Sequence, residues 1–203
     1  MAYLVLVRHG QSEYNAKNWW TGWDDPSLTD LGKKEAVNAG ENLKDIHFDL
    51  AYASALKRTQ ETLEIILQII GQTEIPVTIN AALNERDYGD YTKKNKWEVK
   101  KQVGDEIFQK IRRSWDYPVP HGETLKDVYN RVVPYFETEI LPKVKNGKNV
   151  LISSSGNSLR ALVKFLENVS ETKIPLLEIP TGEVYVYEMN KEGKILQKEI
   201  RKA

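Results

Sequence analysis

Short apolar runs and amphipathic stretches alternate along the chain. Runs of mostly aliphatic residues predict buried strands, because a strand covered on both faces needs no polar alternation, and they fall at residues 4–7, 48–53, 77–79 and 149–153. Apolar positions at helical spacing predict helices over residues 56–70, 124–144 and 158–166, and another that opens at Leu28–Gly32 with Thr29 as its cap. The charged stretch 93–115 predicts helix in pieces, interrupted near Gly104.

The order of these elements predicts the fold class. Strands that alternate with helices favour a mostly parallel sheet with helices on both faces, which is a three-layer α/β/α sandwich. Two final apolar runs, at residues 184–189 and 195–200, flank a turn at 190–193 and predict a hairpin that adds an antiparallel edge. We find no repeat and no low-complexity tract, so residues 1–203 are expected to form a single domain.

Composition narrows the function classes. The 29 Lys and Arg residues balance 29 Asp and Glu residues, which argues against binding nucleic acid or a membrane surface through bulk charge. The absence of cysteine excludes a disulfide framework, a thiolate nucleophile and a zinc ribbon. The apolar opening stops at Arg8, too soon for a secretory signal or a membrane span, so we expect a cytoplasmic protein.

Two of the predicted strands end in residues that can carry chemistry. The first leads into Arg8-His9-Gly10, and the strand at 149–153 leads into Ser153–Ser158 and a helix. Ligands of such sheets gather beyond the carboxyl ends of the strands, and small residues before a helix expose N–H groups that suit a phosphate or carboxylate. The structural alternatives are a strand-end histidine without function and a hydroxyl-capped turn.

Several motifs together resemble the histidine phosphatase superfamily, and within it the cofactor-dependent phosphoglycerate mutases most closely. Beyond residues 8–15, the matching segments come in family order and cover nearly the whole chain: residues 21–23, 28–32, 54–58, 83–89, 95–96, 112–114, 156–164 and 179–182. The resemblance implies the family's fold and its reaction, the interconversion of 2- and 3-phosphoglycerate in glycolysis and gluconeogenesis through a phosphohistidine at His9. It also implies a small anionic phosphorylated substrate, 2,3-bisphosphoglycerate as the primer, no metal, and a homodimer as one candidate assembly.

The resemblance also implies roles for individual residues. Arg8 and Arg58 match the arginines that clamp the phosphoryl group, and Glu85 matches the acid/base that handles the hydroxyl proton. The matching substrate-binding positions are Ser12 and Asn15 near the phosphohistidine, Thr21 and Gly22 near the substrate carboxylate, Tyr88, Lys96, Arg112 and Arg113 at the non-reacting end, and Gly156 and Asn157 at the helix start. Taken alone, Arg112 and Arg113 would indicate a solvated helix face.

One position departs from the family pattern. Relatives carry a second histidine before the glycine at position 156, and this chain has Ser155 there. Serine donates a hydrogen bond but is shorter and cannot carry a positive charge, and loss of one transition-state donor typically costs about 10²–10³ in rate. The remaining histidines are His47, which is most simply a surface residue, and His121, in a loop after the arginine pair. Three hypotheses therefore stay open: a mutase weakened at Ser155, a phosphomonoester phosphatase using His9, and a catalytically silent binder of phosphorylated metabolites.

Overall fold

The computed structural model describes residues 1–202 and confirms the predicted alternation of strands and helices. The strands are β1 (Ala2–Arg8), β2 (Leu50–Ala53), β3 (Val77–Ile79), β4 (Val150–Ser154), β5 (Val184–Met189) and β6 (Ile195–Arg201). The α-helices are α1 (Glu13–Ala16), α2 (Asp30–Glu41), α3 (Lys57–Ile69), α4 (Lys96–Val103), α5 (Asp105–Arg113), α6 (Leu125–Tyr135), α7 (Leu141–Lys145) and α8 (Gly156–Leu166). Shorter helical turns are η1 (Ala81–Leu83), η2 (Gly89–Tyr91) and η4 (Ile174–Leu176), and a π-helical segment, η3 (Phe136–Ile140), joins α6 to α7.

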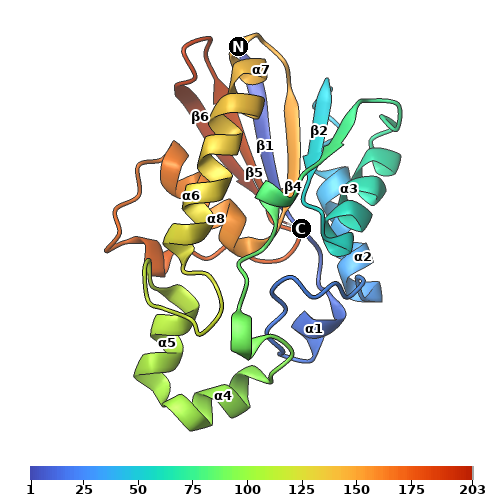
Figure 1. Cartoon of the computed structure of the whole chain (residues 1–203). Coiled ribbons are helices and arrows are strands. Elements are labelled where there is room, and N and C mark those ends of the chain that lie inside the picture. The colour runs from blue at the N-terminus through green and yellow to red at the C-terminus, as the bar shows by residue number, and fades with distance from the viewer. Residues whose placement is uncertain (203) are drawn as a thin grey trace.

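The strands form one mixed sheet in the order β3-β2-β4-β1-β5-β6. β1 pairs in parallel with β4, β4 with β2, and β2 with β3, whereas β5 and β6 add the predicted antiparallel edge. Helices α2 and α3 cover one face of the sheet, and α6, α7 and α8 cover the other (Figure 1). Each face has its own apolar core, one around Leu43, Phe48 and Ile66 and the other around Phe136 and Leu162, so the predicted three-layer sandwich is confirmed.

Helices α4 and α5 stand apart from these layers, beyond the carboxyl end of the central strands (Figure 1). They surround a small separate core in which Trp20 packs against Val99, Phe108 and Ile111. Gly104, with φ of 81°, separates the two helices where the sequence predicted an interruption. The α4–α5 segment therefore faces the sheet end at which the first strand delivers Arg8 and His9.

The loop after β1 is fixed by close backbone packing. Gly10 lies against Gly32 in the first turn of α2, and a Cβ atom at either position would overlap the backbone of the other segment. Thr29 caps α2 as predicted, and its hydroxyl also donates to the backbone oxygen of Gln11. The segment that follows His9 is thus held rigidly against α2.

Candidate active site

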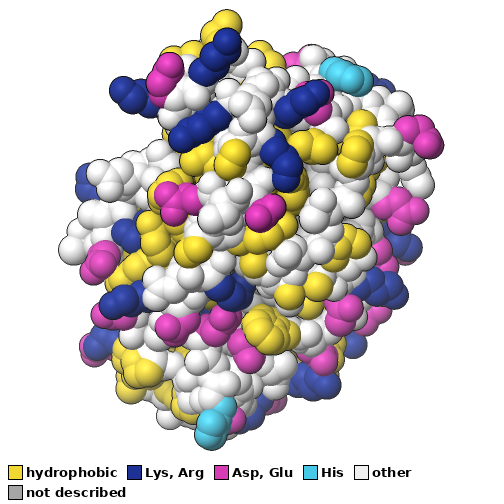
Figure 2. Space-filling view, turned by 45° about the horizontal axis from the view of Figure 1, so that its top comes forward, with side chains coloured by type: hydrophobic (Ala, Val, Ile, Leu, Met, Phe, Trp, Pro, Cys, Tyr) yellow, Lys and Arg dark blue, Asp and Glu magenta, His cyan; other side chains and the backbone are white. Residues whose placement is uncertain are grey.

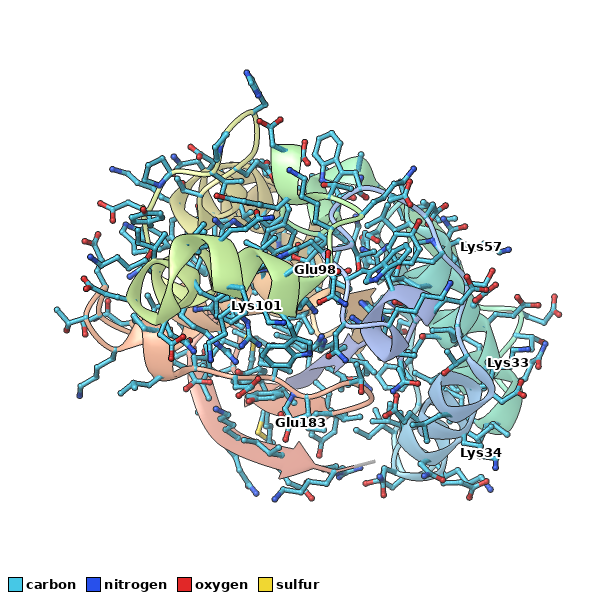
Figure 3. The ribbon with its side chains drawn as sticks, turned by 90° about the horizontal axis from the view of Figure 1, so that it is seen from below. Lys33, Lys34, Lys57, Glu98, Lys101 and Glu183 are labelled. Carbon is cyan, nitrogen blue, oxygen red and sulfur yellow. The ribbon has the colours of Figure 1, made fainter. Side chains whose placement is uncertain are left out.

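A cavity of about 140 Å³ opens where β1 and β4 end, between the sheet and the α4–α5 segment. Figure 3 looks toward this end of the molecule: α4, with Glu98 and Lys101, crosses it, and Lys33, Lys34 and Lys57 lie on the outer side on α2 and α3. The cavity is lined by Arg8, His9, Asn15, Trp20, Thr21, Arg58, Glu85, Tyr88, Lys96, Arg112, Arg113, Gly156, Asn157, Arg160, Glu178 and Ile179. Cationic side chains dominate this lining.

His9 lies in the cavity wall with a defined ring orientation. The residue is 2% exposed, and its backbone N–H donates to the Ser154 carbonyl at 3.0 Å, which ties it to the end of β4. Nδ1 lies 2.7 Å from the Gly10 carbonyl, and Nε2 lies 3.2 Å from Nε of Arg58. Because a carbonyl only accepts and a guanidinium only donates, this pattern assigns the proton to Nδ1 and leaves Nε2 with its lone pair.

The electrostatic surroundings keep His9 neutral. Burial lowers the pKa of His9 well below 6.5, and the charges of Arg58 and Arg8 lower it further. A buried imidazole beside two guanidinium groups resists protonation because both effects disfavour its charged form. At neutral pH, Nε2 is therefore an unprotonated nitrogen, which is the form that can attack phosphorus.

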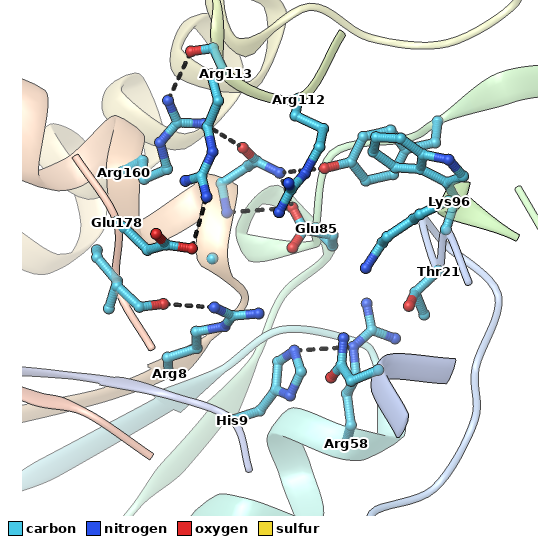
Figure 4. A pocket seen from close by; sticks show the side chains of 16 residues that line it. Arg8, His9, Thr21, Arg58, Glu85, Lys96, Arg112, Arg113, Arg160 and Glu178 are labelled. Atoms are coloured by element: carbon cyan, nitrogen blue, oxygen red, sulfur yellow. Dashed lines mark hydrogen bonds and ion pairs between the residues drawn. The ribbon is translucent and has the colours of Figure 1, made fainter. Parts of the chain in front are cut away.

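Neutral carbonyl groups hold the two arginines beside His9. Arg58, the second residue of α3, is 1% exposed and donates from its Nη atoms to the Asp24 and Gly22 carbonyls at 3.0 Å each. Arg8 donates from Nη1 to the Ile179 carbonyl, and its buried Nε has no partner among residues 1–202 (Figure 4). The two guanidinium groups are thus fixed in place without losing their charge, and an anionic oxygen would satisfy the free Arg8 Nε.

Glu85 reaches the same cavity from the chain segment between η1 and η2. Its Oε1 accepts from three donors, the backbone N–H groups of Arg86 at 2.6 Å and of Asn157 at 3.3 Å and Nδ2 of Asn157 at 2.9 Å. The same Asn157 amide donates to the Tyr88 hydroxyl at 2.8 Å. One carboxylate oxygen is therefore anchored at the start of α8, which orients the other for proton transfer.

The α4–α5 segment supplies the far wall. Lys96 is the first residue of α4, and Arg112 and Arg113 end α5, so the predicted far-end cations meet in one place (Figure 4). Burial, followed by the charges of Arg112 and Arg8, lowers the pKa of Lys96 to about 8. Lys96 also lies 5.8 Å from the Trp20 ring centre, a cation–π distance.

Other predicted site residues lie behind the cavity. Ser12 caps α1 and bonds to Asn15, and the Gly22 carbonyl accepts from Arg58; neither residue lines the cavity. Ser155 is fully buried at the N-cap position of α8 but makes no side-chain capping hydrogen bond, because its Oγ has no hydrogen-bond partner among residues 1–202. The structure therefore brings Asn15, but not the Ser12 or Ser155 hydroxyls, to the surface of the cavity.

The structure also adds residues to which the sequence assigned no role. Arg160 donates to Oδ1 of Asn157 at 2.8 Å and to the Arg113 carbonyl at 2.8 Å, and Trp20, Glu178 and Ile179 complete the lining. A signal for Arg160 exists, since an arginine within the apolar run 159–163 is expected to be buried with partners. No local pattern marks Glu178. The exposed His121 bonds to Asp90 and, like the exposed His47, lies outside the lining.

Comparisons with known proteins agree with this geometry. Residues 4–200 match the model of the histidine phosphatase superfamily, branch 1. The chain is 50% identical over 199 residues to the 2,3-bisphosphoglycerate-dependent phosphoglycerate mutase of Parvibaculum lavamentivorans, covering 97% of this chain and 95% of that one. The chain belongs to the 2,3-bisphosphoglycerate-dependent phosphoglycerate mutase family of this superfamily. The mutase of the same name from Methylocella silvestris is 48% identical and covers 97% of both chains.

The fold of this phosphoglycerate mutase family member is shared with solved structures of the superfamily. The structure of Bacillus stearothermophilus YhfR superimposes with a TM-score of 0.82 at 26% identity, covering 96% of this chain and 94% of that one. None of the helices within residues 1–202 has the length and apolar character needed to cross a bilayer. The same residues contain no group of three or more His, Cys, Asp or Glu side chains placed to hold a metal ion.

Proposed function

We propose that the protein interconverts 2-phosphoglycerate and 3-phosphoglycerate by transferring a phosphoryl group to and from Nε2 of His9. One observation carries the proposal: a neutral, oriented histidine lies beside two fixed arginines in a cavity whose far wall is also cationic. The names of relatives that are about half identical over nearly the whole chain support the same reaction.

In this mechanism the Nε2 lone pair forms the N–P bond as the phosphorus–oxygen bond of the donor breaks. Arg58 gives up its hydrogen bond to Nε2 at that point and, with Arg8, binds the oxygens of the transferring group. The departing oxygen takes its proton from Glu85, and Glu85 removes the hydroxyl proton when phospho-His9 transfers the group back. Each cycle moves one phosphoryl group from His9 to the free hydroxyl oxygen of a phosphoglycerate and returns one from the other oxygen of that glycerate to His9, so the phosphate changes position and phospho-His9 is regenerated.

The residues present fit 2,3-bisphosphoglycerate as the primer. Its two phosphoryl groups need two cationic regions, and the cavity offers Arg8 and Arg58 near His9 and the Lys96, Arg112 and Arg113 group opposite. When bound, this compound supplies the phosphoryl group that primes His9. Tyr88, Asn15, Thr21 and the start of α8 at Gly156 and Asn157 would complete the binding surface, with Ser12, Gly22 and Ser155 supporting it from behind.

We further propose that residues 1–203 work as one catalytic domain in the cytoplasm, on a small metabolite rather than on nucleic acid, and without a metal. The face drawn in Figure 2 supports the choice of partner, because its basic and acidic side chains are interspersed rather than separated by sign. A homodimer is supported by the open edge strand β3, where Val77 and Ile79 are 45% and 50% exposed beside an apolar groove on α3. Sedimentation analysis of the purified chain tests this assembly.

The activity is tested in a primed assay that follows 2-phosphoglycerate and inorganic phosphate together. We expect 2-phosphoglycerate to form from 3-phosphoglycerate at a rate that rises with added 2,3-bisphosphoglycerate. His9→Ala should abolish this activity, whereas His47→Ala, a change at an exposed histidine outside the cavity, should not alter it. Labelling with 2,3-bisphosphoglycerate that carries ³²P in its phosphoryl groups should give an acid-labile phosphoprotein that the His9 variant lacks.

The two rival functions give different results in the same assay. A phosphatase would release phosphate steadily and form no 2-phosphoglycerate. A catalytically silent binder, which the unpartnered Ser155 hydroxyl favours, would bind phosphoglycerate with no turnover and no label on His9. Either result would replace the proposed mutase reaction.

A further inference from the structure

Glu178 places a negative charge at the rim of the anion-binding cavity. It lies in the segment between η4 and β5, and its Oε1 accepts a hydrogen bond from Nη2 of Arg113 at 2.6 Å (Figure 4). The next residue, Ile179, accepts from Arg8 through its carbonyl, so the backbone at this point is held in place. The Glu178 side chain is 62% exposed, whereas that of Arg113 is 22% exposed. The carboxylate can therefore leave Arg113 for solvent without movement of the backbone.

The surroundings keep this carboxylate ionised. The hydrogen bond from Arg113 lowers the pKa of Glu178 most, and the charges of Arg113, Arg112 and Arg8 lower it further. Among residues 1–202, Glu178 is the partner that the Arg113 guanidinium contacts by ion pair or hydrogen bond. The other arginines fixed around the cavity, such as Arg58 and Arg8, are held by backbone carbonyls instead. Of the arginines that line the cavity within residues 1–202, Arg113 is the one that is ion-paired with a carboxylate, a group that an incoming anion can imitate.

We propose that Glu178 is a specificity-determining residue: an internal anion that occupies Arg113 in the free protein and competes there with the non-reacting anionic group of the ligand. The inference rests on the proposed function, because it requires a ligand with two anionic ends. A ligand with one anionic group, seated at His9, Arg8 and Arg58, does not need Arg113 and escapes the competition. Glu178 thus lowers the affinity for phosphoglycerate relative to that for inorganic phosphate.

Isothermal titration calorimetry with 3-phosphoglycerate and, separately, inorganic phosphate tests the competition at low ionic strength. Glu178→Gln keeps the shape and removes the charge, and Glu178→Ala removes the hydrogen bond as well. We expect the Kd for 3-phosphoglycerate to fall by about two- to fivefold in both variants, as exposed ion pairs of this kind allow, and the gain to shrink at high salt. The Kd for phosphate should change less.

The matched control is Glu41→Gln. Glu41 ends α2 outside the cavity and pairs with Lys44 at 2.7 Å, so the change also removes one carboxylate charge and one ion pair. It should leave both Kd values unchanged. In an Arg113→Gln background, adding Glu178→Gln should no longer tighten the binding of 3-phosphoglycerate, because the competition requires the Arg113 guanidinium.

Three results would overturn the inference. Unchanged 3-phosphoglycerate affinity in both Glu178 variants, with the wild type binding normally, refutes the competition alone and leaves the mutase function standing. Equal tightening of phosphate and 3-phosphoglycerate would show a general field effect rather than competition on Arg113. Absence of 3-phosphoglycerate binding by the wild type would refute the proposed function together with this inference.

Discussion

Replacing Ser155 by histidine should raise turnover by about 10²–10³-fold. Position 155 follows Ser154, whose carbonyl accepts from the His9 N–H at 3.0 Å, so it stands beside the proposed phosphohistidine. The Ser155 hydroxyl is fully buried, has no partner among residues 1–202 and does not line the cavity, so it delivers no donor to a phosphoryl group there. A histidine side chain reaches farther and can carry a charge, and one such donor is worth about 2.7–4 kcal/mol in the transition state.

The assay is the primed mutase reaction at saturating 3-phosphoglycerate, with kcat as the readout. Ser155→Ala is the companion variant: because the hydroxyl makes no hydrogen bond, its removal should change kcat by less than about threefold and should not lower the free energy of unfolding. The gain in Ser155→His should vanish when His9→Ala is added. The reasoning is refuted if Ser155→His leaves kcat unchanged, or if Ser155→Ala loses as much activity as His9→Ala, since the serine would then already supply the donor.

Two further predictions concern side chains of the cavity wall, and a third concerns an ion pair outside the cavity lining. Because the pKa of Lys96 is lowered to about 8, its charge is lost as pH rises through that value, so kcat/KM should fall above pH 8. Lys96→Arg should abolish this alkaline decrease. Its persistence in the variant would contradict the assignment of the decrease to Lys96. Glu85→Gln should lower kcat by about 10²–10⁴-fold in the primed assay, and an unchanged kcat would remove Glu85 as the acid/base. Arg131→Met should lower the free energy of unfolding by about 3 kcal/mol in urea titration. The largely buried Glu123 carboxylate pairs with Arg131 at 2.7 Å, and the change leaves this carboxylate without its cationic partner. A loss below about 1 kcal/mol would contradict this reasoning.

The fold was largely predictable because its signals are local. Aliphatic runs marked β1, β3 and β4, and Thr29 marked the start of α2 through its own side chain. The start of α8 was predicted two residues late, at residue 158 rather than Gly156. Ser155, Gly156 and Asn157 resemble a loop in isolation, and what extends the helix there includes the Glu85 carboxylate accepting from the Asn157 N–H, a contact between residues 72 positions apart. Such a contact leaves no local trace in the sequence.

The candidate site likewise contains residues that local sequence signals predicted and residues that only long-range contacts bring together. The position at a strand end pointed to Arg8 and His9 from the residues themselves. The convergence of Lys96, Arg112 and Arg113 on the same cavity was implied only by resemblance, because Arg112 and Arg113 taken alone indicate a solvated helix face. Packing of α4 and α5 on the Trp20 core, which joins side chains distant in sequence, is what turns these cations inward. Glu178 was not predicted, because its contact with Arg113 joins residues 65 positions apart in the sequence.

The way the arginines are held explains how a chain of zero formal net charge builds a strongly cationic cavity. Backbone carbonyl groups accept hydrogen bonds from Nη atoms of Arg58, Arg8 and Arg160, so each guanidinium is oriented before a ligand arrives and keeps its charge for that ligand. Carboxylate partners would fix the same side chains but cancel the field that binds phosphate. Arg113 departs from this rule by pairing with Glu178, and it does so at the exposed rim, where the carboxylate can be displaced. Affinity can therefore be tuned at Arg113 without disturbing the groups that surround His9.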